Sequence, residues 1–248
     1  MLLDSPVSGH GTGALNHMIE TACVIGAGRV GTAIAARLRE RGVTVTVTGR
    51  RLEVGSAGLV VLCVPDAAIA EVAGGIAPGP WIAHTSGATP LTALAPHTRR
   101  FSLHPLQTFT PARGAEQLDG IFAAVTGDTP EALAAAHELA ALLGVEPFAL
   151  ADADRPAYHA GAALAANYLV TLHRAASLLF ESAGVPAAAL TPLLRQTVDN
   201  GFELTGPIAR GDWATVELHL ATLRERAPRL EPLYRVLADA TVDLVLSA

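Results

Sequence analysis

The sequence predicts an α/β domain built on a parallel, doubly wound sheet, followed by an all-α C-terminal domain. Apolar, strand-like runs alternate with helix-like segments as far as Leu150, which is typical of parallel strands joined by crossover helices. Only helix-like segments follow Leu150. The expected strands are residues 21–26, 43–48, 58–64, 81–87, 99–105, 121–127 and 145–150.

The remaining segments divide the chain further. The first seventeen residues are rich in glycine and have no periodicity, so we expect a flexible leader, a misassigned start or a cloning remnant. The helices expected after the sheet are 155–183, 187–199, 212–226 and 229–246, with Asp212 as an N-cap. The predicted parts are a leader at 1–20, a sheet domain at 21–152 and a helical domain at 153–248.

Composition excludes several classes of function. A net charge of −6 argues against nucleic-acid binding. All 17 basic residues are arginine, so no lysine can form a Schiff base or act as a general acid. Cys23 and Cys63 lie in apolar runs, and we expect them to be buried and reduced, without a metal site or disulfide.

No segment is typical of a membrane span or a signal peptide. The longest stretch without Asp, Glu or Arg, residues 72–98, is interrupted by glycines and prolines. Residues 156–173 are long enough to span but contain several polar side chains. We therefore expect a cytoplasmic protein.

A glycine-rich turn follows the first expected strand. Gly26, Gly28 and Gly31 have the spacing at which a strand turns into a helix around a dinucleotide diphosphate. Gly26 would form the tight turn, Gly28 would let the backbone approach the anion, and Gly31 would let helix and strand pack closely. With Arg29 and Val30 in the same turn, the motif predicts a Rossmann-like nucleotide site; a plain tight turn is the alternative.

The end of the second strand selects the nucleotide. A site for NAD carries an acidic residue there, whereas this chain has Arg50 and Arg51, whose guanidinium groups suit the 2′-phosphate of NADP. A solvated basic turn is the alternative. Only residues 49–57 separate this strand from the next, so we expect the adenine side of the sheet to be shortened.

Ligands of parallel sheets bind at the carboxyl ends of the strands. Val64 and Pro65 follow the third strand and are expected beside the nucleotide. Ser86 follows the fourth strand, where it could contact the nicotinamide or a substrate carboxylate. His104, near the end of the next strand, could donate a proton or hold a loop. His84 is expected to be a buried, hydrogen-bonded histidine.

The helical domain supplies three further candidates. His159 and Asn167 are eight residues apart, within about 80° of each other on a regular helix. Among so many alanines they either face a ligand in a cleft or pair within the bundle. Arg210, in the polar turn TGPIARGD, could bind a carboxylate or form a structural ion pair.

Six motifs together resemble one two-domain family: GAGRVG, VPD, HTSGA, SLHPLQTF, YHAGAALAANYLVTL and LTGPIARGD. That family joins a Rossmann-like domain to a helical domain of unknown function. It is similar to the 6-phosphogluconate dehydrogenase-like reductases, which include pyrroline-5-carboxylate reductase and ketopantoate reductase. The resemblance runs from Thr21 to the C-terminus and implies an NADP-dependent oxidoreductase that forms a dimer through the helical domain.

The chain departs from these reductases at one catalytic position. Ketopantoate and β-hydroxyacid reductases use a lysine and an asparagine on one helix face; here Asn167 matches the asparagine, but Ala163 stands one turn earlier. We expect reduction of a ketopantoate-like 2-oxo acid, with His159 or His104 donating the proton, Asn167 orienting the carbonyl and Arg210 holding the carboxylate. The alternatives are an imine reductase and a non-catalytic, NADP-binding regulatory protein.

Overall fold

The computed structural model describes residues 19–49 and 53–247. The chain divides into two compact units, one that ends at Ala162 and one that begins at Ala163. This division falls inside the first long helical stretch, beyond the domain boundary expected after residue 152. Each unit is described by itself.

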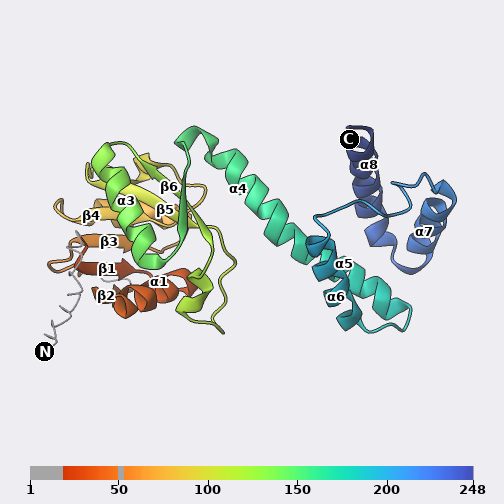
Figure 1. Cartoon of the computed structure of the whole chain (residues 1–248), viewed down its shortest axis with the longest axis horizontal. Coiled ribbons are helices and arrows are strands. Elements are labelled where there is room, and N and C mark those ends of the chain that lie inside the picture. The colour runs from red at the N-terminus through yellow and green to blue at the C-terminus, as the bar shows by residue number, and fades with distance from the viewer. Residues whose placement is uncertain (1–18, 50–52, 248) are drawn as a thin grey trace, which may run out of the picture. The chain divides into compact units, whose positions relative to one another are not determined.

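Seven strands of the first unit form one sheet in the order β2-β1-β3-β4-β5-β6-β7 (Figure 1). Strands β1 to β5 are parallel, which confirms the predicted Rossmann-like α/β architecture. The strands span Thr21–Ile25 (β1), Thr44–Thr48 (β2), Leu59–Leu62 (β3), Trp81–His84 (β4), Arg100–Pro105 (β5), Phe122–Gly127 (β6) and Glu146–Ala149 (β7).

Helices cover both faces of this sheet, because its inner strands are apolar on both sides. The covering helices are α1 (Arg29–Glu40), α2 (Ile69–Gly74), the 3-10 helix η2 (Leu91–Leu94) and α3 (Pro130–Leu143). Helices α1 and α3 share an apolar core with Val24. Helices α2 and η2 share the other core with Cys23. These two residues are neighbours in β1, so the alternation of side chains along the strand separates the two cores.

The sheet ends early on the side of β2, its outer strand. In the described part of the segment between β2 and β3, residue 49 and residues 53–58, there is no helix or strand. The adenine side is therefore shortened, as predicted. Arg50 and Arg51, the predicted ligands of a 2′-phosphate, lie outside the described residues.

The last two strands run opposite to the others, so the expectation of a uniformly parallel sheet was wrong for them. Strand β6 is antiparallel to β5, with Pro105 opposite Ala123, and β7 runs parallel to β6. The connection between β5 and β6, residues 106–121, contains only the 3-10 turn η3 (Ala115–Leu118) and no crossover helix. Without a crossover, the chain re-enters the sheet at the end where it left it.

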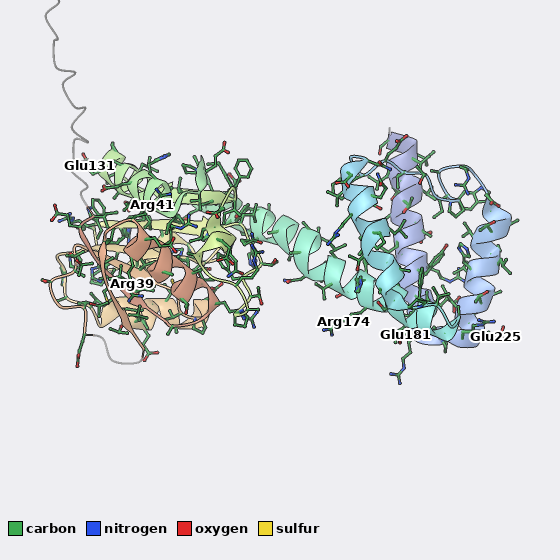
Figure 2. All side chains as sticks on the ribbon, turned by 60° about the horizontal axis from the view of Figure 1, so that its bottom comes forward. Arg39, Arg41, Glu131, Arg174, Glu181 and Glu225 are labelled. Atoms are coloured by element: carbon green, nitrogen blue, oxygen red, sulfur yellow. The ribbon has the colours of Figure 1, made fainter. Side chains whose placement is uncertain are left out.

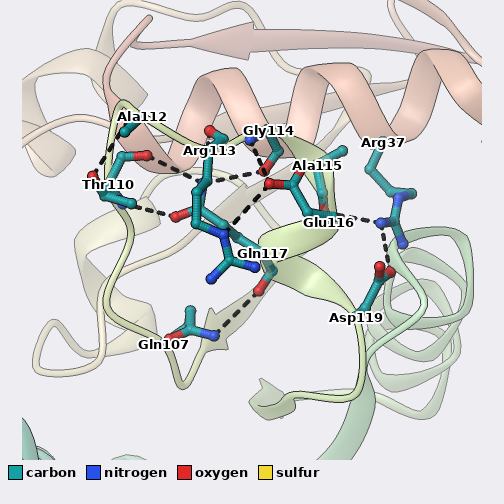
Figure 3. Close-up of polar contacts among 10 residues, drawn as sticks. All are labelled: Arg37, Gln107, Thr110, Ala112, Arg113, Gly114, Ala115, Glu116, Gln117 and Asp119. Atoms are coloured by element: carbon teal, nitrogen blue, oxygen red, sulfur yellow. Dashed lines mark hydrogen bonds and ion pairs between the residues drawn. The ribbon is translucent and has the colours of Figure 1, made fainter. Parts of the chain in front are cut away.

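Buried polar side chains fix this connection in place (Figure 3). Gln117 is buried within the loop, where its Oε1 accepts from the backbone N–H of Thr110 at 2.8 Å and its Nε2 donates to the carbonyl of Arg113 at 2.9 Å. Arg37 of α1 donates to the carboxylate of Asp119 at 2.7 Å. The loop is therefore held against α1 although it contains little regular structure.

The described residues of the second unit contain helices and turns but no strand. Its helices span Leu164–Tyr168 (η5, a π-helical turn), Leu169–Ser182 (α5), Ala187–Ala189 (η6), Leu190–Asp199 (α6), Trp213–Arg226 (α7), Pro228–Leu230 (η7) and Glu231–Ser247 (α8). Asp212 caps α7, as predicted, by accepting from the N–H of Thr215 at 3.1 Å. Figure 2 shows exposed charged side chains along these helices, including Arg174, Glu181 and Glu225. No helix among the described residues is long and apolar enough to cross a membrane.

Candidate functional site

The glycine turn joins β1 to α1, and two of its glycines are sterically required. Gly26 has a φ of +109°, and a Cβ there would lie 2.3 Å from the carbonyl oxygen of Cys63. A Cβ on Gly31 would lie 1.9 Å from the carbonyl oxygen of Gly26. The turn is therefore packed so closely against the end of β3 and the start of α1 that neither position has room for a side chain.

Gly28 differs from these two glycines because its side of the turn is open. A Cβ there would meet no atom within 4 Å, and its φ of −79° suits any residue. Gly28 is the N-cap of α1, whose first turn has no acidic side chain and no side-chain cap. Because free N–H groups at a helix N-terminus favour an anion, this open glycine turn (Gly26–Gly31) fits the diphosphate of a dinucleotide.

Of the other described residues predicted to bind the nucleotide, two pack against the apolar cores and two are exposed. Val30 packs against the core shared by α1 and α3, and Val64 packs against the opposite core. Arg29 is exposed on the first turn of α1, and Pro65 is exposed just after β3. Arg29 and Pro65 are therefore the more accessible to a ligand.

Polar side chains replace the apolar core on one part of the sheet. His84 pairs with Ser102 in the strand register, and Ser102 pairs with Thr126. His104 lies two residues beyond Ser102 and therefore on the same face. The start of α4 (Arg155–Ala163) contacts this polar cluster through Arg155.

The Arg155 side chain is only 1% exposed and is bonded to several elements. It donates to the hydroxyl of Ser102, to the Thr126 hydroxyl at 2.8 Å and to the Ser86 carbonyl at 3.3 Å. Its charge is paired with the carboxylate of Asp152 at 2.6 Å. The sequence did not predict this role for Arg155, because an arginine that follows acidic residues at a helix start is usually exposed.

His84, the last residue of β4, and Ser86, two residues beyond it, are both buried. Ser86 is buried, and its Oγ accepts from the N–H groups of Ala88 at 3.2 Å and Thr89 at 3.0 Å, so it stabilises its own loop. His84 is buried as expected, but neither ring nitrogen has a hydrogen-bond partner among the described residues. Burial and then the charge of Arg155 lower the pKa of His84 to about 4, so the ring is neutral at pH 7.

His104 forms a pair with a tyrosine of α4. Its Nδ1 lies 2.7 Å from the hydroxyl oxygen of Tyr158, and its ring packs on Gly87, where a Cβ would lie 2.9 Å from Cε1. Burial, followed by the nearby His159 and Arg155, lowers the pKa of His104 to about 4. Burial also raises the pKa of the Tyr158 hydroxyl. Both members of the pair are therefore uncharged at pH 7.

The structure brings together two of the predicted catalytic residues, His104 and His159, and places the third, Asn167, in the other unit with the predicted substrate ligand Arg210. The rings of His104 and His159 have centroids 6.5 Å apart, and His159 is exposed. Asn167 is exposed in the π-helical turn η5, and Arg210 donates to the carbonyl of Thr205. The predicted common face of His159 and Asn167 assumed a regular helix between them; the π-helical turn breaks that spacing, so the assumption was wrong.

Comparison with known proteins gives a family match for part of the chain. The model of a family described as a domain of unknown function (DUF2520) matches residues 121–241, from the start of β6 into α8. No curated protein matches this chain.

Solved structures share the fold over most of the chain. A candidate NADP oxidoreductase from Bacteroides fragilis is 23% identical, with a TM-score of 0.78 over 91% of this chain and 99% of its own. A reductive aminase from Aspergillus terreus, solved with NADPH and ethyl levulinate, is 19% identical, with a TM-score of 0.61 over 91% of this chain and 94% of its own. A 1-pyrroline-5-carboxylate reductase from Streptococcus pyogenes is 17% identical, with a TM-score of 0.59 over 92% of this chain and 98% of its own. At these identities the likeness is one of fold.

Proposed function

We propose that this protein is an NADP-dependent oxidoreductase that reduces the carbonyl group of a small, ketopantoate-like 2-oxo acid. The open glycine turn carries the proposal, because Gly28 leaves free the one place where a diphosphate needs close approach to the backbone. The polar cluster supports it, because His84 and His104 lie at or near the carboxyl ends of β4 and β5, the edge where parallel sheets bind ligands.

The nucleotide, when bound, supplies a hydride to the carbonyl carbon. The N–H groups of the open glycine turn would hold its diphosphate, and Arg50 and Arg51 would hold the 2′-phosphate. The fold shared with a reductive aminase solved with NADPH supports the choice of NADP. Asn167 as the group that orients the carbonyl and Arg210 as the carboxylate ligand are proposals that rest on the sequence.

Imine reduction is the second candidate function. A pyrroline-5-carboxylate reductase and a reductive aminase share the fold, and this chain contains no lysine that could act as an acid. The nitrogen of a reduced imine can take its proton from water, so imine reduction depends less on a proton-donating side chain. A non-catalytic, NADP-binding regulatory role is the third candidate.

An assay of NADPH consumption separates these candidates. We expect turnover with ketopantoate, which requires both the nucleotide site and a proton donor. Turnover with 1-pyrroline-5-carboxylate alone would select imine reduction. Tight binding of NADPH with no turnover of either substrate would select the regulatory role and contradict the proposed reductase.

We also propose that the protein is a homodimer joined through its helical unit. Several large apolar side chains of this unit are mostly exposed, among them Leu218 (66%), Val236 (67%) and Leu246 (80%). Large apolar side chains that stay exposed in a single chain are typical of a surface that binds another protein molecule. Light scattering at micromolar concentration should give twice the mass of the chain, and the mass of a single chain would contradict the dimer.

A further inference from the structure

Tyr158, which was not among the predicted site residues, has the environment of a proton donor. Reduction of a carbonyl requires a proton for the oxygen, and the chain has no lysine to give it. His104 is uncharged at pH 7, since burial lowers its pKa to about 4. The Tyr158 hydroxyl lies 2.7 Å from Nδ1 of this neutral ring, and the tyrosine is only partly buried.

Packing on several sides fixes the position of this hydroxyl. The Tyr158 ring meets the rings of His104 and Phe148 edge-on, with centroids 5.6 and 5.9 Å away. One turn earlier in α4, Arg155 is bonded to Ser102 of β5, so the start of the helix is held on the sheet. The pair therefore has a set place near the carboxyl end of β5, where a substrate of the proposed reaction would bind.

We propose that the Tyr158 hydroxyl is the catalytic acid of the reduction and that His104 relays the proton to it. This inference rests on the proposed reduction of a 2-oxo acid. In the tautomer with its proton on Nδ1, His104 donates to the Tyr158 oxygen and leaves the phenol O–H free for a substrate.

The proton transfers balance without any further reagent. The carbonyl carbon gains the hydride, the carbon–oxygen π bond breaks, and the oxygen takes the proton of the Tyr158 hydroxyl. The Tyr158 oxygen takes the proton from Nδ1 of His104, and Nε2 of the same ring takes one from bulk water, which releases hydroxide to the solvent. The product is the alcohol, the tyrosine is again protonated, and the histidine is neutral in its other tautomer.

The chain contains a second histidine–tyrosine pair that serves as a matched control. Nδ1 of His219 lies 2.8 Å from the hydroxyl of Tyr234, with ring centroids 5.8 Å apart, nearly the same geometry. This pair joins α7 to α8 in the helical unit and has no place on the sheet. Loss of either hydroxyl removes one hydrogen bond of the same kind, so Tyr234→Phe reports the purely structural effect.

The test compares Tyr158→Phe with Tyr234→Phe in the full-length protein. With ketopantoate, Tyr158→Phe should lower kcat about 100-fold, the usual contribution of a general acid. With 1-pyrroline-5-carboxylate it should lower kcat less than about threefold, because water can protonate that nitrogen. Calorimetry adds a binding measurement: Tyr158→Phe should weaken oxamate, a non-reacting 2-oxo acid analogue, about fivefold in the presence of NADP. Tyr234→Phe should change none of these values.

Several results would overturn the assignment of Tyr158. They are an equal loss of turnover on both substrates, turnover of the imine alone, unchanged oxamate affinity in Tyr158→Phe, and neither turnover nor oxamate binding in the unmutated protein. The proposed function itself fails on the unmutated protein, by no binding of NADPH, by binding of NADPH without turnover of either substrate, or by turnover of the imine alone. An effect confined to Tyr158→Phe decides the assignment of Tyr158 and leaves the proposed function standing. Equal affinity for NADPH in all three proteins is expected, since neither tyrosine lies in the open glycine turn.

Discussion

The two units of this chain bury their apolar residues to very different extents. In the sheet unit, helix α3 buries seven of its 14 residues, including Leu139. In the helical unit, helix α8 has 17 residues and buries none of them, and α5 likewise buries none of its 14. The sheet unit therefore completes its own core, whereas the helical unit leaves apolar surface that a second molecule could cover.

Close packing around glycine shows the same contrast. In the sheet unit the backbone of the glycine turn is so near its neighbours that a Cβ on Gly31 would overlap another main-chain oxygen. In the helical unit a Cβ on Gly206 or Gly211 would meet no atom within 4 Å. Small increases of volume should therefore be costly at the closely packed glycines of the sheet unit, such as Gly31, and not at Gly206 or its open counterparts.

Alanine at Gly31 should produce the largest effect. The added Cβ would lie 1.9 Å from the Gly26 carbonyl oxygen, and we expect the free energy of unfolding to fall by about 4 kcal/mol or more. Gly206→Ala should change it by less than about 1 kcal/mol, because the site is open. Urea denaturation measures both values. Similar losses of unfolding free energy in the two variants would contradict the difference in packing between Gly31 and Gly206.

A pair of leucine truncations tests the same contrast on side chains. Leu139→Ala in α3 removes a side chain that is fully buried, which should cost about 3 kcal/mol. Leu218→Ala in α7, where the side chain is 66% exposed, should cost under about 0.5 kcal/mol when the protein is dilute enough to be monomeric. A large loss at Leu218 under those conditions would mean that this side chain is buried in the single chain, against its exposed place on α7.

The buried histidines predict a dependence on pH that belongs to the sheet unit. The pKa of His84 is about 4 in the folded chain, below its usual 6.5, so the unfolded chain binds more protons between these values. The contribution of neutral His84 to the free energy of unfolding is therefore fully present above the unfolded pKa of 6.5. It is lost as the pH falls toward the folded pKa of about 4. Between pH 7.5 and pH 5 this residue should account for a loss of about 2 kcal/mol.

His84→Gln serves as the control, since it keeps a polar side chain but cannot be protonated. Between pH 7.5 and pH 5, the free energy of unfolding should fall by about 2 kcal/mol less in the variant than in the unmutated protein. An equal loss in both proteins would mean that His84 is as readily protonated in the folded chain as in the unfolded one.

The sequence predicted the elements well because their patterns are local. The apolar runs of β1 and β3, the glycine spacing of the first turn and the Asp212 cap each depend on residues next to one another in the chain. The direction of β6 could not be predicted in this way. It depends on the absence of a crossover helix from residues 106–121, whose structure comes from single side chains such as Gln117.

The candidate site was predicted only in part for a similar reason. His104 was found because it falls at a strand end, and that position follows from the strand pattern. Arg155 and Tyr158 were missed because their partners lie more than 50 residues away, on strands of the sheet. The common face of His159 and Asn167 was inferred from a regular helical period, which the π-helical turn interrupts.

Calorimetric titration of the protein with NADPH and with NADH tests the proposed nucleotide site most directly. NADPH should bind at least tenfold more tightly, because a charge-assisted contact from Arg50 or Arg51 to the 2′-phosphate is worth about 1.5–3 kcal/mol. Gly28→Ala should fold normally, since its Cβ meets no atom within 4 Å, yet lose most of its affinity for NADPH. Equal affinity for the two nucleotides would contradict the choice of NADP, and no binding of either would contradict the site itself.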